Sequence, residues 1–252
     1  MNTFILSLQL LTRIPIKKQI DVKDDMLIRG VNFYPLIGVV IGVFDLLVFW
    51  VLSLFMPKLF AALCAVLAEL CITGGFHLDG LSDTADAIYS ARTKERMLEI
   101  MKDSRVGSNG VIASVMDMLF KLILIFTSAH TMTALVLAPV AGKMVQSMLM
   151  YKAVYPRDKG LGHSYIGRIT GDILMISSLS GFIIMTVGLI PVAGWFSPVF
   201  PAACFILAFG YRKYIESKID GMTGDTLGAG SEIMEIFFLI LFVAFETTGL
   251  IR

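Results

Sequence analysis

The stretch Tyr34-Pro-Leu-Ile-Gly-Val-Val-Ile-Gly-Val-Phe-Asp-Leu-Leu-Val-Phe-Trp-Val-Leu-Ser-Leu-Phe-Met56 decides the class of this protein, because Asp45 is its only charged residue. A transmembrane helix needs about 20 predominantly apolar residues. The run is continuous, whereas a strand of a membrane barrel would be about half as long and would alternate apolar with polar residues. The stretch therefore predicts a helix that spans a membrane.

Six further stretches predict spanning helices: approximately Leu59–Gly74, Val111–Ser128, Thr131–Met150, Ile173–Val192, Phe196–Tyr211 and Ile233–Leu250. The second and sixth predicted spans are the weakest, since Gly74-Gly75 ends the second, and Pro198 and Pro201 shorten the sixth. Met1–Leu11 is apolar but too short to span, and no signal-peptide cleavage site follows it. We expect an all-α, polytopic integral membrane protein over residues 1–252, a single domain of about seven transmembrane helices plus a short N-terminal interfacial or re-entrant helix.

The composition agrees with a membrane protein. Hydrophobic residues make up 56% of the chain and charged residues 16%, against roughly 25% charged in soluble proteins. Mean hydropathy is +0.80 and the net charge is +1. These values exclude a disordered chain, a nucleic-acid-binding domain and an ordinary soluble enzyme. All three cysteines lie in apolar runs, which argues against disulfides and against a cysteine metal site.

The basic residues predict the orientation. Seventeen of the 21 Lys and Arg residues precede the first predicted span or fall in the second-to-third, fourth-to-fifth and sixth-to-seventh connections, and only Lys58 and Arg252 fall on the opposite side. Cytoplasmic loops are enriched in Lys and Arg. We therefore expect the N-terminus and the long loops in the cytoplasm.

The segment Glu69 to Asp86 carries the most informative polar residues. In a helix that begins at Asp79, the carboxylates of Asp79, Asp83 and Asp86 share a face about 60° wide. Carboxylates that are this close repel one another unless a cation neutralises them. Oxygen ligands without a Cys or His cluster favour Mg²⁺ or Mn²⁺. The alternative is a solvated helix start, where acidic residues suit the macrodipole.

A second acidic segment, Asp220 to Glu232, contains Thr223, Gly224, Asp225 and Gly228. Its glycines could expose backbone N–H groups to phosphate oxygens at a helix N-terminus, or they could form a helix cap and loop. A basic segment from Arg92 to Gly110 includes Lys102, Asp103 and Arg105. Cations beside a Mg²⁺ site suit a substrate with several phosphates, although cytoplasmic positive charge alone explains part of this pattern.

Ionisable residues inside the predicted spans include Asp45, Glu69, Asp117, Lys121 and Lys143. Each costs free energy in hydrocarbon unless it is paired or hydrated. Asp117 and Lys121 can pair on one helix, and Asp45 would pair with Lys143 if the first and fourth spans are neighbours. We expect Glu69 to reach the same water-filled opening as Asp79.

Four motifs resemble the cobalamin synthase family, the adenosylcobinamide-GDP ribazoletransferases. They are Phe33 to Gly38, Thr73-Gly-Gly-Phe-His-Leu-Asp-Gly-Leu-Ser-Asp-Thr-Ala-Asp86, Arg96 to Arg105, and Thr223-Gly-Asp-Thr-Leu-Gly228. The resemblance runs in order from Leu11-Thr-Arg-Ile-Pro15 to the last span. Its coverage makes it specific, whereas an isolated Asp-Gly-x-x-Asp would be weak.

The resemblance implies a reaction and its partners. Adenosylcobinamide-GDP and α-ribazole, or its 5′-phosphate, would give adenosylcobalamin, or its 5′-phosphate, and GMP, with Mg²⁺ as cofactor. It also implies an enzyme in a lipid bilayer, the inner membrane of a prokaryote, whose substrates come from the cytoplasm, so that the active site faces the cytoplasm. A homo-oligomer and contacts with other enzymes of the pathway stay open.

The predicted site divides into three groups. The predicted metal ligands are Asp79, Asp83, Asp86, Asp225 and Glu69. The predicted catalytic residues are Asp79, Asp83, Asp86 and His77, with a carboxylate that does not bind the metal, or His77, taking the proton from the ribazole hydroxyl. The predicted substrate-binding residues are Arg92, Lys102, Asp103, Arg105, Gly74, Gly75, Thr223, Gly224 and Gly228.

A transporter for a corrinoid or a cation is the competing class, because it would use the ionisable residues within the spans. Against it, the acidic residues cluster at one predicted membrane face, and the chain shows no pair of related halves. A scaffold for other enzymes would explain the loops but not the aligned carboxylates.

Overall fold

A computed structural model describes residues 2–22 and 24–251, so Lys23 and Arg252, both included in the count of basic residues, lie outside it. The described residues form helices and no strand, which confirms the all-α prediction. The α-helices are α1 (Asn2–Leu11), α2 (Asp24–Gly30), α3 (Tyr34–Ser53), α4 (Lys58–Thr73), α5 (Phe76–Ile88), α6 (Lys94–Ile100), α7 (Ser108–Thr127), α8 (Thr131–Met144), α9 (Gln146–Met150), α10 (Gly171–Ala193), α11 (Val199–Ile219) and α12 (Gly224–Thr247). Short 3₁₀ turns cover Val31–Phe33, Leu161–Ser164 and Gly194–Phe196.

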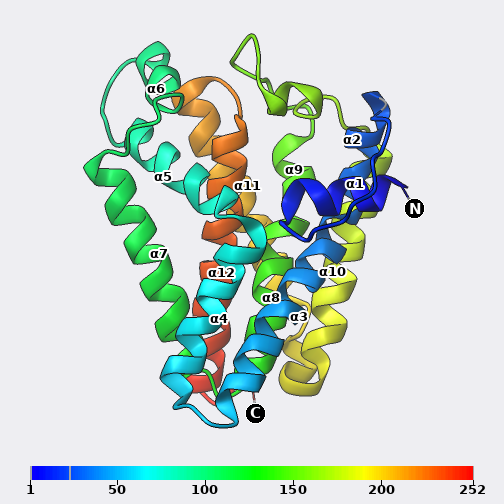
Figure 1. Cartoon of the computed structure of the whole chain (residues 1–252), viewed down its shortest axis with the longest axis vertical. Coiled ribbons are helices and arrows are strands. Elements are labelled where there is room, and N and C mark those ends of the chain that lie inside the picture. Colours follow the sequence, from blue (N-terminus) through cyan, green and yellow to red (C-terminus); the bar gives the residue numbers. More distant parts are fainter. Residues whose placement is uncertain (1, 23, 252) are drawn as a thin grey trace.

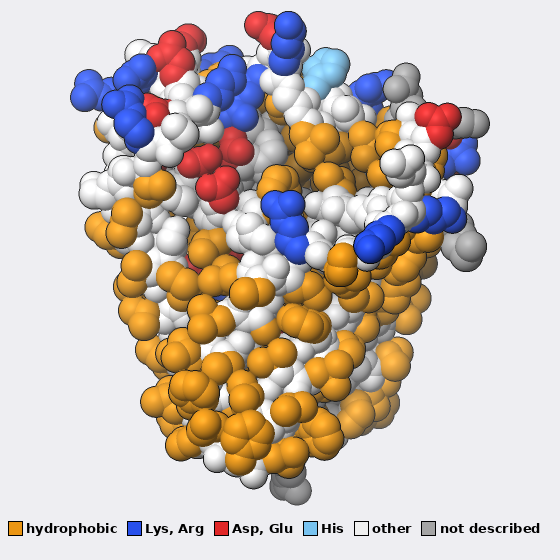
Figure 2. Space-filling view, in the orientation of Figure 1, with side chains coloured by type: hydrophobic (Ala, Val, Ile, Leu, Met, Phe, Trp, Pro, Cys, Tyr) orange, Lys and Arg blue, Asp and Glu red, His pale blue; other side chains and the backbone are white. Residues whose placement is uncertain are grey.

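The long helices run side by side as a bundle, with α1, α5 and α6 near one end of it (Figure 1). Charged side chains gather at that end, and the rest of the visible surface is mostly apolar (Figure 2). Large hydrophobic side chains such as Leu47, Ile123 and Val187 are more than half exposed. An apolar belt of this kind suits lipid rather than water. The chain is therefore a helical membrane protein.

Fewer helices have the length and apolar composition of a membrane span than the sequence predicts. Five described helical segments are long and apolar enough to cross a membrane, and six if the bent pair α4 and α5 counts as one. The two exceptions are the spans predicted to be weakest. α4 has 16 residues and ends at the two glycines, and the last two turns of α11 carry Arg212, Lys213, Glu216 and Lys218.

Helix α8 lies at the centre of the bundle, with α3, α10 and α12 packed against it. Its contacts depend on small residues. A Cβ atom at Gly38 or Gly42 of α3 would collide with the backbone of α8, and a Cβ at Gly142 would collide with Ser231 of α12. Because lipid provides no hydrophobic drive between helices, close backbone approach is a main source of their attraction. These contacts place α12 beside α5, where the candidate site lies.

Candidate active site

A sharp bend between α4 and α5 creates the site. Gly74 and Gly75 have φ values of 68° and 69°, a left-handed conformation that glycine adopts at little cost. The two helices consequently meet at 90°. Helix α5 starts at Phe76 rather than at Asp79, so all three predicted carboxylates belong to one helix that lies across the charged end of the bundle.

The carboxylates of α5 form an acidic cluster with Asp225 of α12. Partial burial and the negative charges of Asp79, Asp225 and Asp86, in that order of influence, raise the pKa of Asp83 from 3.8 to about 7. Figure 2 shows a patch of acidic side chains near the charged end of the bundle. Asp225, from the second acidic segment, therefore joins the site that the first segment begins.

Close packing of α5 on α12 holds Asp225 in place. A Cβ at Gly80 would lie 2.7 Å from the backbone oxygen of Asp225, and a Cβ at Gly228 would lie 3.1 Å from the backbone oxygen of His77. The side chain of Thr223 caps α12 by accepting a hydrogen bond from the backbone N–H of Thr226. Gly228 and Thr223 thus have structural contacts here, whereas Gly224 has open space around its Cα.

Arg157 is a functional candidate that the sequence analysis did not select. Its Nη2 atom donates a hydrogen bond of 2.7 Å to Oδ2 of Asp225. Its positive charge partly opposes the rise in the pKa of Asp83. Its Nε atom is buried and has no partner in the described part of the chain. No local pattern relates this loop residue to Asp225, so only the fold places a guanidinium among the carboxylates.

The predicted phosphate-binding residues between α5 and α7 lie at the surface. Arg92 and Lys102 are exposed. Arg105 forms an ion pair of 2.6 Å with Asp103, and its hydrogen bonds lower the pKa of Asp103 to about 2. Arg105 and Asp103 neutralise each other in this structure. None of the described contacts places either residue against the acidic cluster.

Asp86 has a structural role in addition to its place in the cluster. Its Oδ2 accepts a hydrogen bond of 2.6 Å from the backbone N–H of Gly107, and its Oδ1 accepts one of 2.8 Å from that of Gly110. These groups belong to the start of α7, whose unpaired N–H groups favour a negative charge. Asp86 therefore ties α5 to α7, and both of its oxygens are engaged.

His77 lies beneath the acidic face. The side chain is buried, and its Nδ1 atom has no hydrogen-bond partner among the described residues. It lines a cavity of about 20 Å³ together with Lys143, Gln146 and Gly224, which is enough space for about one water molecule. This position leaves Asp79, Asp83 and Asp225 as the groups with better access to substrate.

The prediction that Glu69 reaches the opening beside Asp79 is wrong. Glu69 accepts a hydrogen bond of 2.8 Å from Nζ of Lys121, which also bonds Glu232 and Glu235 of α12 at 2.5 and 2.7 Å. The carboxylates of Glu69, Glu232 and Glu235 lie close enough together to hold a metal. The ammonium group of Lys121 lies among them instead, because pairing within the bundle offsets the cost of burying these charges.

The other intramembrane residues follow the same arrangement. Asp117 approaches Lys121 only to 4.0 Å, so the predicted pair within α7 is the longest of the ion pairs that Lys121 forms. Helices α3 and α8 are neighbours, as the pairing of Asp45 with Lys143 requires. Lys143 nevertheless donates its hydrogen bonds to Ser231 and Glu235, and the oxygen Oδ1 of Asp45 has no partner in the described residues.

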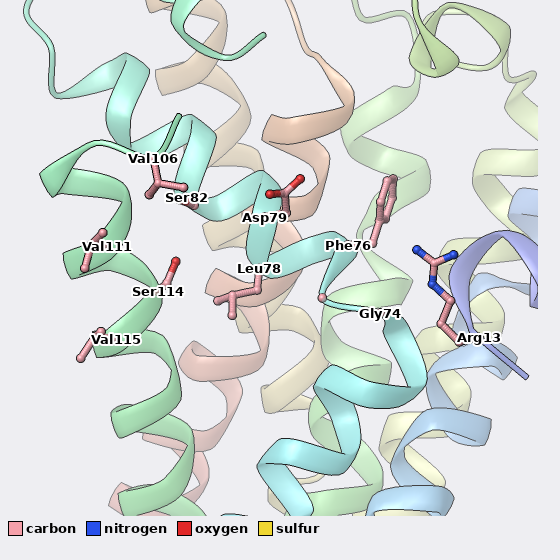
Figure 3. A pocket seen from close by; sticks show the side chains of 11 residues that line it. Arg13, Gly74, Phe76, Leu78, Asp79, Ser82, Val106, Val111, Ser114 and Val115 are labelled. Atoms are coloured by element: carbon pink, nitrogen blue, oxygen red, sulfur yellow. The ribbon is translucent and has the colours of Figure 1, made fainter. Parts of the chain in front are cut away.

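An open groove of about 680 Å³ extends beside Asp79 (Figure 3). Asp79, Ser82 and Ser114 supply polar groups, and Leu78, Val106, Val111 and Val115 supply an apolar wall. Arg13, Phe76, Gly74 and Gly75 also line it. The two glycines therefore border a space large enough for a nucleoside-sized ligand.

The fold and these contacts define a helical membrane protein with a carboxylate cluster and a groove at one end of its bundle, an arrangement suited to a hard cation and a phosphate ester. The model of the family described as cobalamin-5-phosphate synthase matches residues 3–243. The chain belongs to this family, which confirms the resemblance noted in its motifs.

Curated relatives of similar length share this family. The adenosylcobinamide-GDP ribazoletransferase of Clostridium novyi (strain NT) is 41% identical over the whole of both chains. That of Clostridioides difficile (strain 630) is 40% identical, over 95% of this chain and 96% of its own. That of Alkaliphilus metalliredigens (strain QYMF) is 38% identical, over 99% and 98%. No solved structure matches the chain.

Proposed function

We propose that this protein joins adenosylcobinamide-GDP to α-ribazole, or to its 5′-phosphate, and releases GMP. The relatives are named for this activity, and they align with this chain over nearly their full length. The observation that supports the same chemistry here is the convergence of Asp79, Asp83 and Asp225 beside an open groove. In the reaction, a ribazole hydroxyl oxygen bonds to the phosphorus attached to the corrinoid, the bond from that phosphorus to GMP breaks, and the hydroxyl proton is released.

We infer that Asp79, Asp83 and Asp225 hold Mg²⁺. The donor set fits this ion, because it consists of carboxylate oxygens, and partial burial together with their mutual repulsion raises the pKa of Asp83. When bound, Mg²⁺ would neutralise charge on the diphosphate as GMP leaves. Arg157 would orient the diphosphate by the donors that Asp225 does not occupy. A carboxylate outside the metal shell would accept the proton of the attacking hydroxyl.

The acidic cluster would face the cytoplasm. The predicted cytoplasmic loops carry most of the basic residues, and the charged end of the bundle in Figure 2 includes both the basic and the acidic side chains. Helix α1 lies at this end and α12 finishes near the opposite end (Figure 1). Seven crossings, with α4 and α11 as the two shortest in apolar length, would place these ends on opposite sides of the inner membrane.

The test is GMP release by the purified protein in nanodiscs, with adenosylcobinamide-GDP, with and without Mg²⁺ and α-ribazole. We expect release only when both are present, and we expect Asp79→Asn to abolish it at saturating Mg²⁺ without unfolding the protein. Asp25→Asn, which removes an exposed carboxylate paired with Arg29, is the matched control and should retain activity. Absence of GMP release from the wild-type protein would favour a transporter or a scaffold and refute the proposal.

A further inference from the structure

Arg13 reaches the groove although it is far from the acidic residues in sequence. It follows α1, and its backbone N–H donates a hydrogen bond of 2.6 Å to the carbonyl of Ile72 near the end of α4. A Cβ atom at Gly74 would collide with Nε of Arg13, so the guanidinium group rests against the bend between α4 and α5. Figure 3 shows it beside Phe76, in the groove that Asp79 also lines.

The guanidinium group of Arg13 has no carboxylate partner among the side chains that the structure describes. Arg105 is paired with Asp103, and Arg157 is paired with Asp225, but Arg13 forms no comparable ion pair and its side chain is exposed. A guanidinium presents several N–H donors in a planar fork that matches a phosphate group. The groove therefore has an available anion-binding group in addition to the acidic cluster.

The surroundings of Arg13 suit one part of the acceptor. The diphosphate of the donor substrate belongs at the acidic cluster, where Arg157 and the proposed Mg²⁺ oppose its charge. The groove adds an apolar wall of Leu78, Val111 and Val115, which suits an aromatic base. A nucleoside monophosphate offers both an aromatic base and a second anionic group. The family description, cobalamin-5-phosphate synthase, also names a phosphorylated product, which requires a phosphorylated acceptor.

We propose that Arg13 binds the 5′-phosphate of the acceptor and sets the preference for α-ribazole 5′-phosphate over α-ribazole. This inference rests on the proposed function. It assigns Arg13 to substrate specificity, because the transfer reaction itself does not require a contact with the 5′-phosphate. Gly74 contributes by leaving space for the guanidinium group beside the bend. The bond is a charge-assisted hydrogen bond, so its loss should cost the phosphorylated acceptor about tenfold to a hundredfold in kcat/KM.

The experiment compares the two acceptors in the wild-type protein, Arg13→Met and Arg13→Lys. The quantity measured is the ratio of kcat/KM for α-ribazole 5′-phosphate to that for α-ribazole, with adenosylcobinamide-GDP saturating. We expect Arg13→Met to lower this ratio at least about tenfold, and Arg13→Lys to lower it less, because lysine keeps the charge and loses the planar fork. Lys17→Met, a change of an exposed basic residue in the same segment, should leave the ratio at the wild-type value.

An unchanged ratio in Arg13→Met would overturn the proposal, whether the activity falls with both acceptors or with neither. A second measurement covers a folded Arg13→Met variant whose turnover is too slow to give a ratio. Binding of α-ribazole 5′-phosphate to Asp79→Asn should weaken when Arg13→Met is added, and equal binding would contradict the proposal. Failure of the proposed function gives a different result, since the wild-type protein would then release no GMP with either acceptor.

Discussion

Lys121 of α7 and Glu232 of α12 form an ion pair of 2.5 Å inside the bundle, with both side chains at least 95% buried. Glu69 and Glu235 share the same ammonium group. Three helices that are distant in sequence, α4, α7 and α12, are therefore joined at one nitrogen atom. Because α12 also supplies Asp225, this buried contact helps to fix the helix on which the candidate site depends.

Replacement of Lys121 should destabilise the protein strongly. Lys121→Met leaves buried glutamates without their central cation, and removal of one partner from a buried ion pair costs about 3–5 kcal/mol. Thermal unfolding in nanodiscs measures the effect. Lys94→Met is the control, because Lys94 pairs with Asp220 at the surface and such pairs contribute about 0–1 kcal/mol. Equal melting temperatures for the two variants would show that the buried cluster does not stabilise the fold.

Substitution of Asp86 should loosen the start of α7. Asp86→Ala removes the acceptors of two backbone N–H groups, and loss of a helix cap costs about 0.5–2 kcal/mol. Hydrogen exchange at Gly107 and Gly110 should accelerate, whereas the amides in the centre of α7 should keep their protection. Asp86→Asn retains one acceptor oxygen and should have an intermediate effect. Unchanged exchange at both glycines would argue against the capping role.

Without added metal, the free energy of unfolding should fall as the pH rises from about 4 to about 7. The pKa of Asp83 is raised from 3.8 to about 7 in the folded state, so the folded protein binds this proton more tightly than the unfolded chain does. Above pH 7 this contribution should be constant. Added Mg²⁺ competes with the proton and should stabilise the protein more at high pH than at low pH. Denaturation of the wild-type protein and Asp83→Asn at several pH values measures this dependence, which the variant should lose.

The two glycines of the bend provide a matched pair of substitutions. Both have a positive φ, so alanine at either position costs about 1 kcal/mol through backbone strain. Only Gly74→Ala also places a Cβ against Arg13, since the space around Gly75 is open. We expect Gly74→Ala to be the less stable variant in thermal unfolding and to lower the acceptor ratio described for Arg13. Gly75→Ala with the larger effect on that ratio would contradict this assignment.

Local patterns predicted the helices well because helical periodicity depends on neighbouring residues. The apolar stretches, the interruption at Gly74-Gly75 and the shared face of Asp79, Asp83 and Asp86 are all visible in the sequence. The two weakest predicted spans are also the two whose helices are not long and apolar enough to cross a membrane by themselves. The predicted starting point of α5 was three residues late. The helix begins at Phe76, directly after Gly75 in a left-handed conformation, rather than at Asp79.

The sequence by itself determined that this chain is a helical membrane protein with acidic residues aligned on one helix, because hydropathy and spacing act over short distances along the chain. Only the tertiary structure decided that Arg157 joins those acids through Asp225, that Glu69 pairs with Lys121, and that Arg13 enters the groove. The physical reason is that these contacts depend on which helices pack together and at what angle. That choice results from small residues such as Gly80 and Gly228 at the helix interfaces, and their partners lie more than a hundred residues away in the chain.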